Sequence, residues 1–505
     1  MTLAGWSALL AAAQAPERAL RAALADPRAS QARWLAAHLA ANAESRFGRD
    51  HGFAAIRSIA DYRAAVPIAP YDAFRPAIAA MAAGAASELV VDPVIAFEQT
   101  GGTASGGKLV PYTASSLTSF SAAVLPWLAD LARRRPAITQ GRAYVSISPA
   151  TRQPAVTAGG IAIGLPEAAY LGADLARALG SILAVPPDVG AIAEIPEWRL
   201  ATLAALVEAD DLAFVSVWSP TFLLDLIEAL PSHAEAVAVR LTPPARQRLA
   251  RALAGPVIDT ARLWPDLAAI SCWSDASSAP FAARLAALCP QAAIEPKGLL
   301  ATEAAITLPH GSAPGSIPAL TSGFLEFVDD AGAARLVDEL EAGATYRVVV
   351  TTPAGFYRYD IGDRLACLGH VGAVPRLAFV GRAGLVSDMV GEKLDDAFVG
   401  TVLRRLPVPA ALVARALPRP HYRLWLDAGA ECDADAAARA VEAGLRANPQ
   451  YAYARDLGQL GPLAREPRPG FAAARAAIRA GAGIRLADVK PQALIVEHMR
   501  DPPGT

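Results

Sequence analysis

Between about residues 115 and 260, helical patterns of apolar residues alternate with short runs of β-branched and aromatic residues. Two of these runs, 143–148 and 212–218, have the length of buried strands, and 268–273 is a further buried strand candidate. An alternation of this kind predicts a layered α/β core. Residues 1 to about 82 are predicted to be mostly helical, with breaks near Pro67 and Pro70.

The pattern changes after about residue 320. Strand-like runs follow one another at 324–328, 345–352, 364–368 and 377–380, with turn residues between them. Such a succession predicts a small antiparallel, barrel-like sheet attached to the α/β core. The segment Gly381-Arg-Ala-Gly384 indicates a boundary, and the rest of the chain mixes strands with alanine-rich helices. We therefore expect an N-terminal domain over 1–382, a hinge near 382–385 and a smaller, mobile α+β domain over 386–505.

The length of 505 residues, the 53% hydrophobic content and the 19% charged content are typical of a globular protein of more than one domain. A formal net charge of −2 gives no electrostatic signature of nucleic-acid binding. Charged residues or prolines interrupt every long apolar stretch, so no membrane span is expected. The apolar start is expected to be an amphipathic helix and not a signal peptide. Four scattered cysteines without a C-x-x-C pair suggest reduced thiols and a cytoplasmic location.

A glycine-rich segment, Thr100-Gly-Gly-Thr-Ala-Ser-Gly-Gly-Lys108, follows a β-branched run at 90–97. Glycines such as Gly102 let a backbone approach phosphate oxygens, while main-chain N–H groups and the hydroxyls of Thr103 and Ser105 supply donors. The spacing Gly102-x4-Gly107-Lys108 also matches a P-loop. However, Leu109 replaces the hydroxyl that holds Mg²⁺ there, and residues 110–112 are predicted to continue as a strand. The segment is therefore interpreted as a phosphate loop of another kind, with a flexible glycine hairpin as the alternative.

Two further segments contain candidate functional residues. In Pro296-Lys-Gly-Leu-Leu-Ala-Thr-Glu303, the carboxylate of Glu303 is a candidate Mg²⁺ ligand with Thr302 beside it, although Thr-Glu pairs also cap helices. In Gly355-Phe-Tyr-Arg-Tyr-Asp-Ile-Gly-Asp363, Asp363 is suited to accept hydrogen bonds from ribose hydroxyls, and Tyr357 is a candidate to stack on a purine. A polar turn between strands is the alternative for this segment.

Only four of the 46 basic residues are lysines: Lys108, Lys297, Lys393 and Lys490. Arginine fills nearly every general cationic role in this chain. The remaining lysines are therefore candidates for positions that need a compact ammonium group instead of a planar guanidinium. The alternative is that a few lysines persist by chance.

The order of these motifs resembles that of the adenylate-forming (acyl-CoA synthetase, adenylation domain and luciferase) superfamily. Within it, the chain is similar to the Gretchen Hagen (auxin-responsive promoter) family of acyl-acid amido synthetases, as a bacterial-type member. The resemblance extends over nearly the whole length, and its segments are 47–56, 66–71, 100–111, 343–363, 379–393, 448–459 and 488–492.

The resemblance implies a role for each matching residue. Thr100, Thr103 and Ser105, with Gly102 and Lys108 in the same loop, would bind the phosphates of ATP. Thr302 and Glu303 would lie at the α-phosphate and Mg²⁺, Asp363 would bind the ribose, and Arg382 would contact the nucleotide near the hinge. Lys490 would be the catalytic lysine that the C-terminal domain delivers during adenylation, when negative charge builds on phosphorus oxygens.

The chain also departs from the family pattern. Leu299 stands where the family usually has tyrosine, Gly101 where serine is common, and Asp360 where plant members usually carry a basic residue. These departures leave the substrates open. Residues 215–222 and 161–165 are candidate walls of an apolar acid pocket, although ordinary core packing explains them equally well.

The expected function is ATP-dependent activation of a carboxylic acid as an acyl-adenylate, followed by amide formation with an amine, for which an amino acid is the expected class. The expected partners are therefore small molecules, ATP and Mg²⁺, and the oligomeric state is not predicted. The alternatives are an acyl-CoA ligase of the same superfamily and a non-catalytic nucleotide- or acyl-binding relative. A P-loop kinase, which would form ADP, is disfavoured by Leu109.

Overall fold

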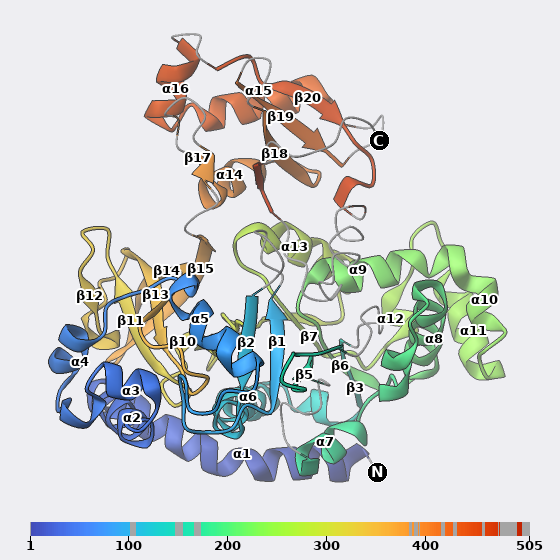
Figure 1. Ribbon diagram of the computed structural model, residues 1–505. Coiled ribbons are helices and arrows are strands. Elements are labelled where there is room, and N and C mark those ends of the chain that lie inside the picture. The colour runs from blue at the N-terminus through green and yellow to red at the C-terminus, as the bar shows by residue number, and fades with distance from the viewer. Residues whose placement is uncertain are drawn as a thin grey trace.

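The computed structural model describes residues 2–100, 108–146, 155–165, 173–382, 386–387, 392, 394–415, 420–427, 432–456, 460–472, 474 and 492–496. Figure 1 shows a large lower part, built from the chain up to about residue 382, and a smaller upper part built from the C-terminal elements. The fold class is that predicted: a large α/β part with an attached antiparallel sheet, and a smaller α+β part. The strand run predicted at 90–97 starts only at Ala96, because Asp92 and Pro93 keep the preceding residues irregular.

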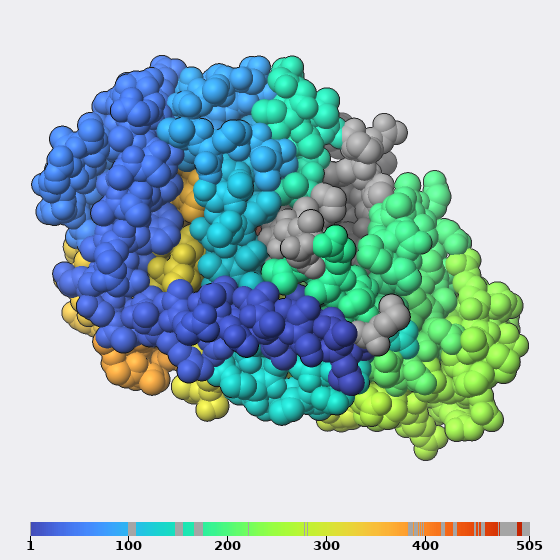
Figure 2. All heavy atoms as spheres, turned by 90° about the horizontal axis from the view of Figure 1, so that it is seen from below, coloured from blue at the N-terminus to red at the C-terminus, as the bar shows by residue number. Residues whose placement is uncertain are grey.

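Helices form the N-terminal region, as predicted: α1 (Thr2–Ala25), α2 (Pro27–Ala41), α3 (Arg46–Asp50), α4 (Ile59–Ala65) and α5 (Tyr71–Ala82). Pro67 and Pro70 lie between α4 and α5, where a helix cannot continue. In the view from below, α1 lies across the face of the molecule (Figure 2). Its buried side chains, among them Trp6 and Leu9, show that this first helix packs on the core.

His38 of α2 lies within this helical region, with its ring stacked between Trp34 and Tyr357. Burial lowers the pKa of His38 to about 4. The amide of Asn42 lies 3.3 Å from Nδ1, where it can donate to a neutral imidazole. The histidine is therefore neutral in the folded protein at pH 7.

We expect the protein to lose about 3 kcal/mol of unfolding free energy through His38 as the pH falls from 6.5 to 4. The folded pKa lies below the unfolded value, so the unfolded chain binds a proton in this window that the folded chain does not. Urea denaturation at pH 7 and pH 4.5 measures the change. A His38→Gln variant should show a smaller pH dependence than the wild type, and equal dependence in both proteins would contradict the assignment.

The first sheet has the strand order β2-β1-β5-β4 and carries the glycine-rich hairpin. Its strands are β1 (Ala96–Thr100), β2 (Lys108–Tyr112), β4 (Ala155–Val156) and β5 (Ala162–Ile163). β1 and β2 are antiparallel, with Thr100 opposite Lys108. The strand predicted after the glycine-rich segment is therefore confirmed, and the next helix, α6 (Ala114–Arg134), begins only after its capping residue Thr113.

The central sheet is parallel, with the strand order β3-β6-β7-β8. Its strands are β3 (Arg142–Val145), β6 (Leu212–Ser216), β7 (Ala269–Cys272) and β8 (Ala293–Pro296), and three of them lie at the predicted strand runs. The associated helices are α7 (Ala173–Gly180), α8 (Ile195–Glu208), α9 (Pro220–Ala229), α10 (Ala234–Ala238), α11 (Pro243–Ala252), α12 (Thr260–Leu263) and α13 (Ala279–Leu288). Parallel strands need such crossover connections, which explains the alternation in the sequence.

The predicted antiparallel sheet has the order β12-β11-β13-β14-β15. Its strands are β11 (Phe324–Val328), β12 (Ala334–Arg335), β13 (Thr345–Thr351), β14 (Tyr359–Val371) and β15 (Val374–Arg382), and the short pair β9 (Thr307–Leu308) and β10 (Ile317–Pro318) precedes it. The N-terminal helices lie beside this sheet (Figure 1). Their side chains share one buried core with it.

A buried ion-pair network joins the sheet to α4. Arg358 donates from Nε to Glu326 Oε2 at 2.8 Å, and Arg63 donates to Glu326 Oε1 at 2.7 Å. Arg358 also donates to the carbonyl oxygen of Val66 at 2.8 Å. Glu326 is 1% exposed and Arg358 is 6% exposed. The network thus neutralises a carboxylate in the core and fixes the chain immediately before β14.

The C-terminal elements have a hydrophobic core of their own, made by residues between Leu394 and Leu494. They are β16 (Val386–Ser387), β17 (Leu394–Asp395), α14 (Asp396–Leu403), β18 (Ala410–Arg415), β19 (His421–Leu426), α15 (Ala434–Leu445), α16 (Pro449–Asp456), β20 (Ala464–Pro467) and β21 (Leu494–Val496). The larger sheet has the order β20-β19-β18-β21. Among the described helices, none combines the length and the apolar character that crossing a membrane requires.

Candidate functional site

The predicted phosphate loop connects the antiparallel strands β1 and β2. Thr100 ends β1 and Lys108 begins β2 directly opposite it, so both ends of the loop are held by the sheet. Residues 101–107, including Gly102, Thr103 and Ser105, lie outside the described residues. Because a strand follows the loop, a Walker-type arrangement, in which a helix starts at this point, does not apply here.

The ammonium group of Lys108 lies among aromatic side chains. Its Nζ donates to the hydroxyl of Tyr359 at 3.4 Å and lies 5.1 Å from the ring centre of Tyr71. Tyr71 is itself held by a 2.8 Å hydrogen bond from its hydroxyl to the carbonyl oxygen of Leu109. These contacts hold the lysine head at the start of β2, close to β14.

Glu303 contacts the same hydroxyl group of Tyr359. The Tyr359 hydroxyl donates to Glu303 Oε1 at 3.3 Å, and the carboxylate is 8% exposed. The neighbouring Thr302 is fixed through its carbonyl oxygen, which accepts a 2.6 Å hydrogen bond from Tyr112 of β2. The structure therefore brings together the loop lysine, the Thr-Glu pair and the segment that starts β14.

Tyr359 was not among the predicted site residues, although it forms the link between Lys108 and Glu303. One indication of this role was present in the sequence, namely that Tyr359 lies inside the candidate segment that ends at Asp363. The sequence offered several aromatic residues in that segment, and only the folded backbone distinguishes between them.

Tyr357, which was predicted to stack on the nucleotide, belongs instead to the core. Its ring is 0% exposed and stacks on Phe47 at 4.7 Å, with Phe53 at its edge. Its hydroxyl donates to the carbonyl oxygen of Leu89 at 2.9 Å, and burial raises its pKa well above the usual value. The ring also stacks on His38 at 5.4 Å, and a fully buried ring with these neighbours cannot stack on a purine, so this prediction is wrong for the structure described.

Asp363 and Arg382 lie opposite each other on neighbouring strands, β14 and β15. Asp363 is 1% exposed and stands four residues after Tyr359 on β14, beyond a bulge in that strand. The bulge depends on Gly362, whose φ of +79° suits glycine, and on Asp360, whose carboxylate accepts from the Gly362 N–H at 3.0 Å. Asp360 is also paired with Arg347 of β13. The catalytic candidate Lys490 lies outside the described residues.

The candidate acid-pocket walls lie in two different sheets. Residues 161–165 include β5, beside β1, and the N–H of Leu165 donates to Glu98 at 2.7 Å. Residues 215–222 leave the carboxyl end of β6, an edge of a parallel sheet at which ligands commonly bind. Cys272 ends the neighbouring strand there, and burial raises the pKa of its thiol to about 12. This thiol is therefore protonated and unreactive at neutral pH.

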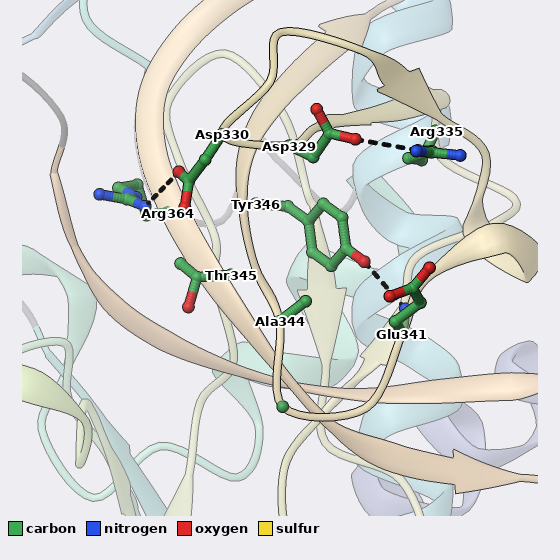
Figure 3. Close-up of a pocket in the computed structure, with 9 residues that line it drawn as sticks. Asp329, Asp330, Arg335, Glu341, Ala344, Thr345, Tyr346 and Arg364 are labelled. Atoms are coloured by element: carbon green, nitrogen blue, oxygen red, sulfur yellow. Dashed lines mark hydrogen bonds and ion pairs between the residues drawn. The ribbon is translucent and has the colours of Figure 1, made fainter.

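A surface pocket of about 390 Å³ lies among β12, β13 and β14 (Figure 3). Four of its charged groups form ion pairs, Arg335 with Asp329 and Arg364 with Asp330, each at 3.0 Å. Lys108, Glu303 and Asp363 are not among its lining residues. This pocket is therefore separate from the candidate site.

The chain matches two family models. The model of the GH3 family N-terminal domain matches residues 17–243, and that of the GH3 family central domain matches residues 316–382. Together these matches cover more than half of the chain. They include the phosphate-loop hairpin, β14 and β15.

Curated relatives align over short segments. The indole-3-acetic acid-amido synthetase GH3.8 of Oryza sativa subsp. indica is 37% identical over 108 residues, which are 20% of this chain and 16% of the relative. The indole-3-acetic acid-amido synthetase GH3.4 of Arabidopsis thaliana is 36% identical over 59 residues, 12% of this chain and 10% of the relative. The alignments thus span less than a fifth of these relatives' own lengths.

Solved structures are similar over nearly the whole chain. The AtGH3.15 acyl acid amido synthetase, in complex with 2,4-DB, has a TM-score of 0.83 at 18% identity and covers 93% of this chain and 92% of its own. A 2-hydroxyisobutyryl-CoA ligase in the postadenylation state has a TM-score of 0.54 at 14% identity and covers 92% of this chain and 89% of its own. The fold is therefore that of adenylate-forming enzymes. With its N-terminal and central domains both matched, the chain belongs to the GH3 family, the Gretchen Hagen family that its motifs resemble.

Proposed function

We propose that this protein uses ATP to activate a carboxylic acid as an acyl-adenylate and then transfers the acyl group to an amine, with an amino acid as the expected class of amine. The observation that carries the proposal is the chain of contacts from Lys108 through Tyr359 to Glu303, which joins three motifs from distant parts of the sequence. Family membership supports it, since the relatives bear the names of amido synthetases.

The loop residues Thr100, Gly102, Thr103, Ser105 and Lys108 would bind the ATP phosphates. In the first half-reaction a carboxylate oxygen of the acid forms a bond to the α-phosphorus, and the bond to pyrophosphate breaks. Main-chain N–H groups, hydroxyls and the Lys108 ammonium favour this step by stabilising the charge on the phosphate oxygens.

Glu303, with Thr302 beside it, is suited to hold Mg²⁺. A carboxylate has acceptor sites beyond the one used by Tyr359, and it is a preferred ligand type for this ion. Among the described residues no three histidine, cysteine or acidic side chains cluster as metal ligands, which fits an ion held by one carboxylate and ATP oxygens. Bound Mg²⁺ would offset phosphate charge. Asp363 would accept from the ribose hydroxyls, and Arg382 would contact the nucleotide.

In the second half-reaction the amine nitrogen attacks the acyl carbon, AMP leaves and the nitrogen gives up a proton to solvent. We propose that residues 386–505 form a mobile domain that turns about a hinge near 382–385 between the two steps. The separate hydrophobic core of the C-terminal elements supports this division. A cytoplasmic location remains a prediction from the cysteine content.

The test is a panel of carboxylic acids scored by AMP release, with amino acids or CoA as the second substrate. The proposal requires AMP formation and an amide product. A thioester product with CoA would instead favour an acyl-CoA ligase. Nucleotide binding without AMP release from any acid would favour a non-catalytic relative, and ADP formation would favour a kinase.

Replacing Lys490 with alanine is expected to lower the rate of acyl-adenylate formation by about 100-fold or more, because a point cation at the α-phosphate is lost. Pyrophosphate exchange measures this first half-reaction. Transfer from a supplied acyl-adenylate to the amine should change much less, which separates the role of the lysine from a folding defect. Unchanged exchange in the variant would refute the assignment.

A further inference from the structure

Lys297 places a buried ammonium group at the carboxyl edge of the parallel sheet. It follows β8 directly and is 6% exposed. Its Nζ donates to Ser216 Oγ, at the end of β6, at 2.7 Å. Since β7 lies between β8 and β6, the lysine side chain, the hydrogen bond and the serine side chain together span two strand spacings, roughly 10 Å. The charge therefore lies near the middle of the sheet edge.

Two tryptophans surround this ammonium group. Its Nζ lies 5.3 Å from the ring centre of Trp127, on α6, and 5.1 Å from that of Trp218, just after β6. Trp218 is half-buried and lies 6.0 Å from the equally half-buried Trp273, just after β7. Indole faces stabilise a cation, and partly exposed indoles also offer a flat surface for an aromatic ring.

Lys297 and Glu303 are six residues apart but face different parts of the molecule. Glu303 faces Tyr359 and Lys108, whereas Lys297 faces β6 and α6. An acid whose reacting carboxylate lay on the Glu303 side would reach Lys297 by extending along the sheet edge. Ligands of open α/β folds bind at this edge.

We propose that Lys297 is a specificity-determining residue that binds a second carboxylate at the remote end of the acid, so that the preferred substrate class is an aromatic acid with an additional anionic group. The ammonium would form a charge-assisted hydrogen bond to that group, while the Ser216 hydroxyl supplies a second donor. The aromatic ring would contact Trp218 and Trp273. In treating the bound acid as a substrate, this inference rests on the proposed function.

The amino-acid composition is consistent with this role. The chain has four lysines among 46 basic residues, and one of them occupies this buried position. An ammonium group is compact and carries three donors, so it can lie between two indoles and still bind both Ser216 and an arriving oxygen. A planar guanidinium would need more room.

The experiment compares the binding of two probes, benzoate and terephthalate, which is benzoate with a second carboxylate at the far end of the ring. Dissociation constants are measured by calorimetry and tryptophan fluorescence, with and without AMP and without turnover. The wild type should bind terephthalate at least about tenfold more tightly than benzoate, the range of a hydrogen bond to a charged group. Lys297→Met should reduce this ratio to near unity, and Ser216→Ala should reduce it in part.

Arg376→Met is the matched control, because it also removes a buried cation, one that donates to carbonyl oxygens beside β15 such as that of His310. Its binding ratio should equal that of the wild type. Three outcomes would overturn the inference. The wild type could bind both acids equally or bind neither of them, or the ratio of the two dissociation constants could be unchanged in Lys297→Met. If the ratio of dissociation constants falls in Lys297→Met but no acid leads to AMP release in the wild type, the binding site is supported and the proposed function is contradicted.

Discussion

Replacing Glu303 with glutamine is expected to lower the rate of AMP release by about 100- to 1000-fold, the usual cost of removing one charged group that stabilises a transition state. The substitution keeps the shape of the side chain and an acceptor for the Tyr359 hydroxyl, but removes the charge proposed to hold Mg²⁺. Steady-state AMP release at saturating acid measures the loss. In a Mg²⁺ titration of the variant, the residual activity should reach half of its maximum at a higher Mg²⁺ concentration than in the wild type, because the metal binds more weakly.

Tyr359→Phe is the control for this prediction. It removes the hydroxyl that joins Glu303 to Lys108 but leaves both charges in place. We expect it to cost far less than the loss of the carboxylate, about tenfold, because one neutral donor is removed. If Glu303→Gln kept activity within tenfold of the wild type, or if both variants lost the same activity, the metal role of Glu303 would be refuted.

Replacing Arg358 with methionine is expected to lower the free energy of unfolding by about 3 kcal/mol or more, which is the cost of breaking a buried ion pair from one side. Among the described residues, the Glu326 carboxylate would then keep Arg63 alone as a cationic partner, and the carbonyl oxygen of Val66 would lose the hydrogen bond from Arg358. Urea denaturation followed by tryptophan fluorescence measures the change. The double variant Arg358→Met with Glu326→Gln should recover part of the loss, because the uncompensated charge is removed.

The matched control is Arg335→Met in the same sheet. Arg335 pairs with Asp329 at 3.0 Å, but its side chain is 45% exposed to solvent. Exposed pairs contribute about 0–1 kcal/mol, so this variant should stay close to the wild type. A loss below 1 kcal/mol in Arg358→Met would show that the buried network is not required for stability.

Local pattern was sufficient to predict several of the longer strands. Periodicity and turn residues located β6, β7, β11 and β13 close to their observed bounds. Strand length and side-chain type depend on neighbouring residues, so they can be read along the chain. The same reasoning predicted that a strand, not a helix, follows the glycine-rich segment, and β2 confirms this.

Pairings between distant residues could not be predicted in this way. Tyr357 and Tyr359 are equivalent candidates by sequence, yet one is enclosed by Phe47 and Phe53 while the other joins Lys108 to Glu303. Arg358, between them, has a φ of +47°, which interrupts the regular alternation of side chains along an extended chain. The backbone preference of arginine does not predict this positive φ. The conformation is stabilised instead by the buried network with Glu326, which the sequence does not reveal.

The glycine-rich loop, its flanking strands and the order of the motifs were determined by the sequence alone, because each depends on residues that are neighbours in the chain. The tertiary structure decided which side chains from different motifs meet. It placed Tyr359 between Lys108 and Glu303, and it brought Lys297 to Ser216 and two tryptophans from other elements. These contacts depend on how sheets and helices pack, and packing energy is shared among residues far apart in the sequence.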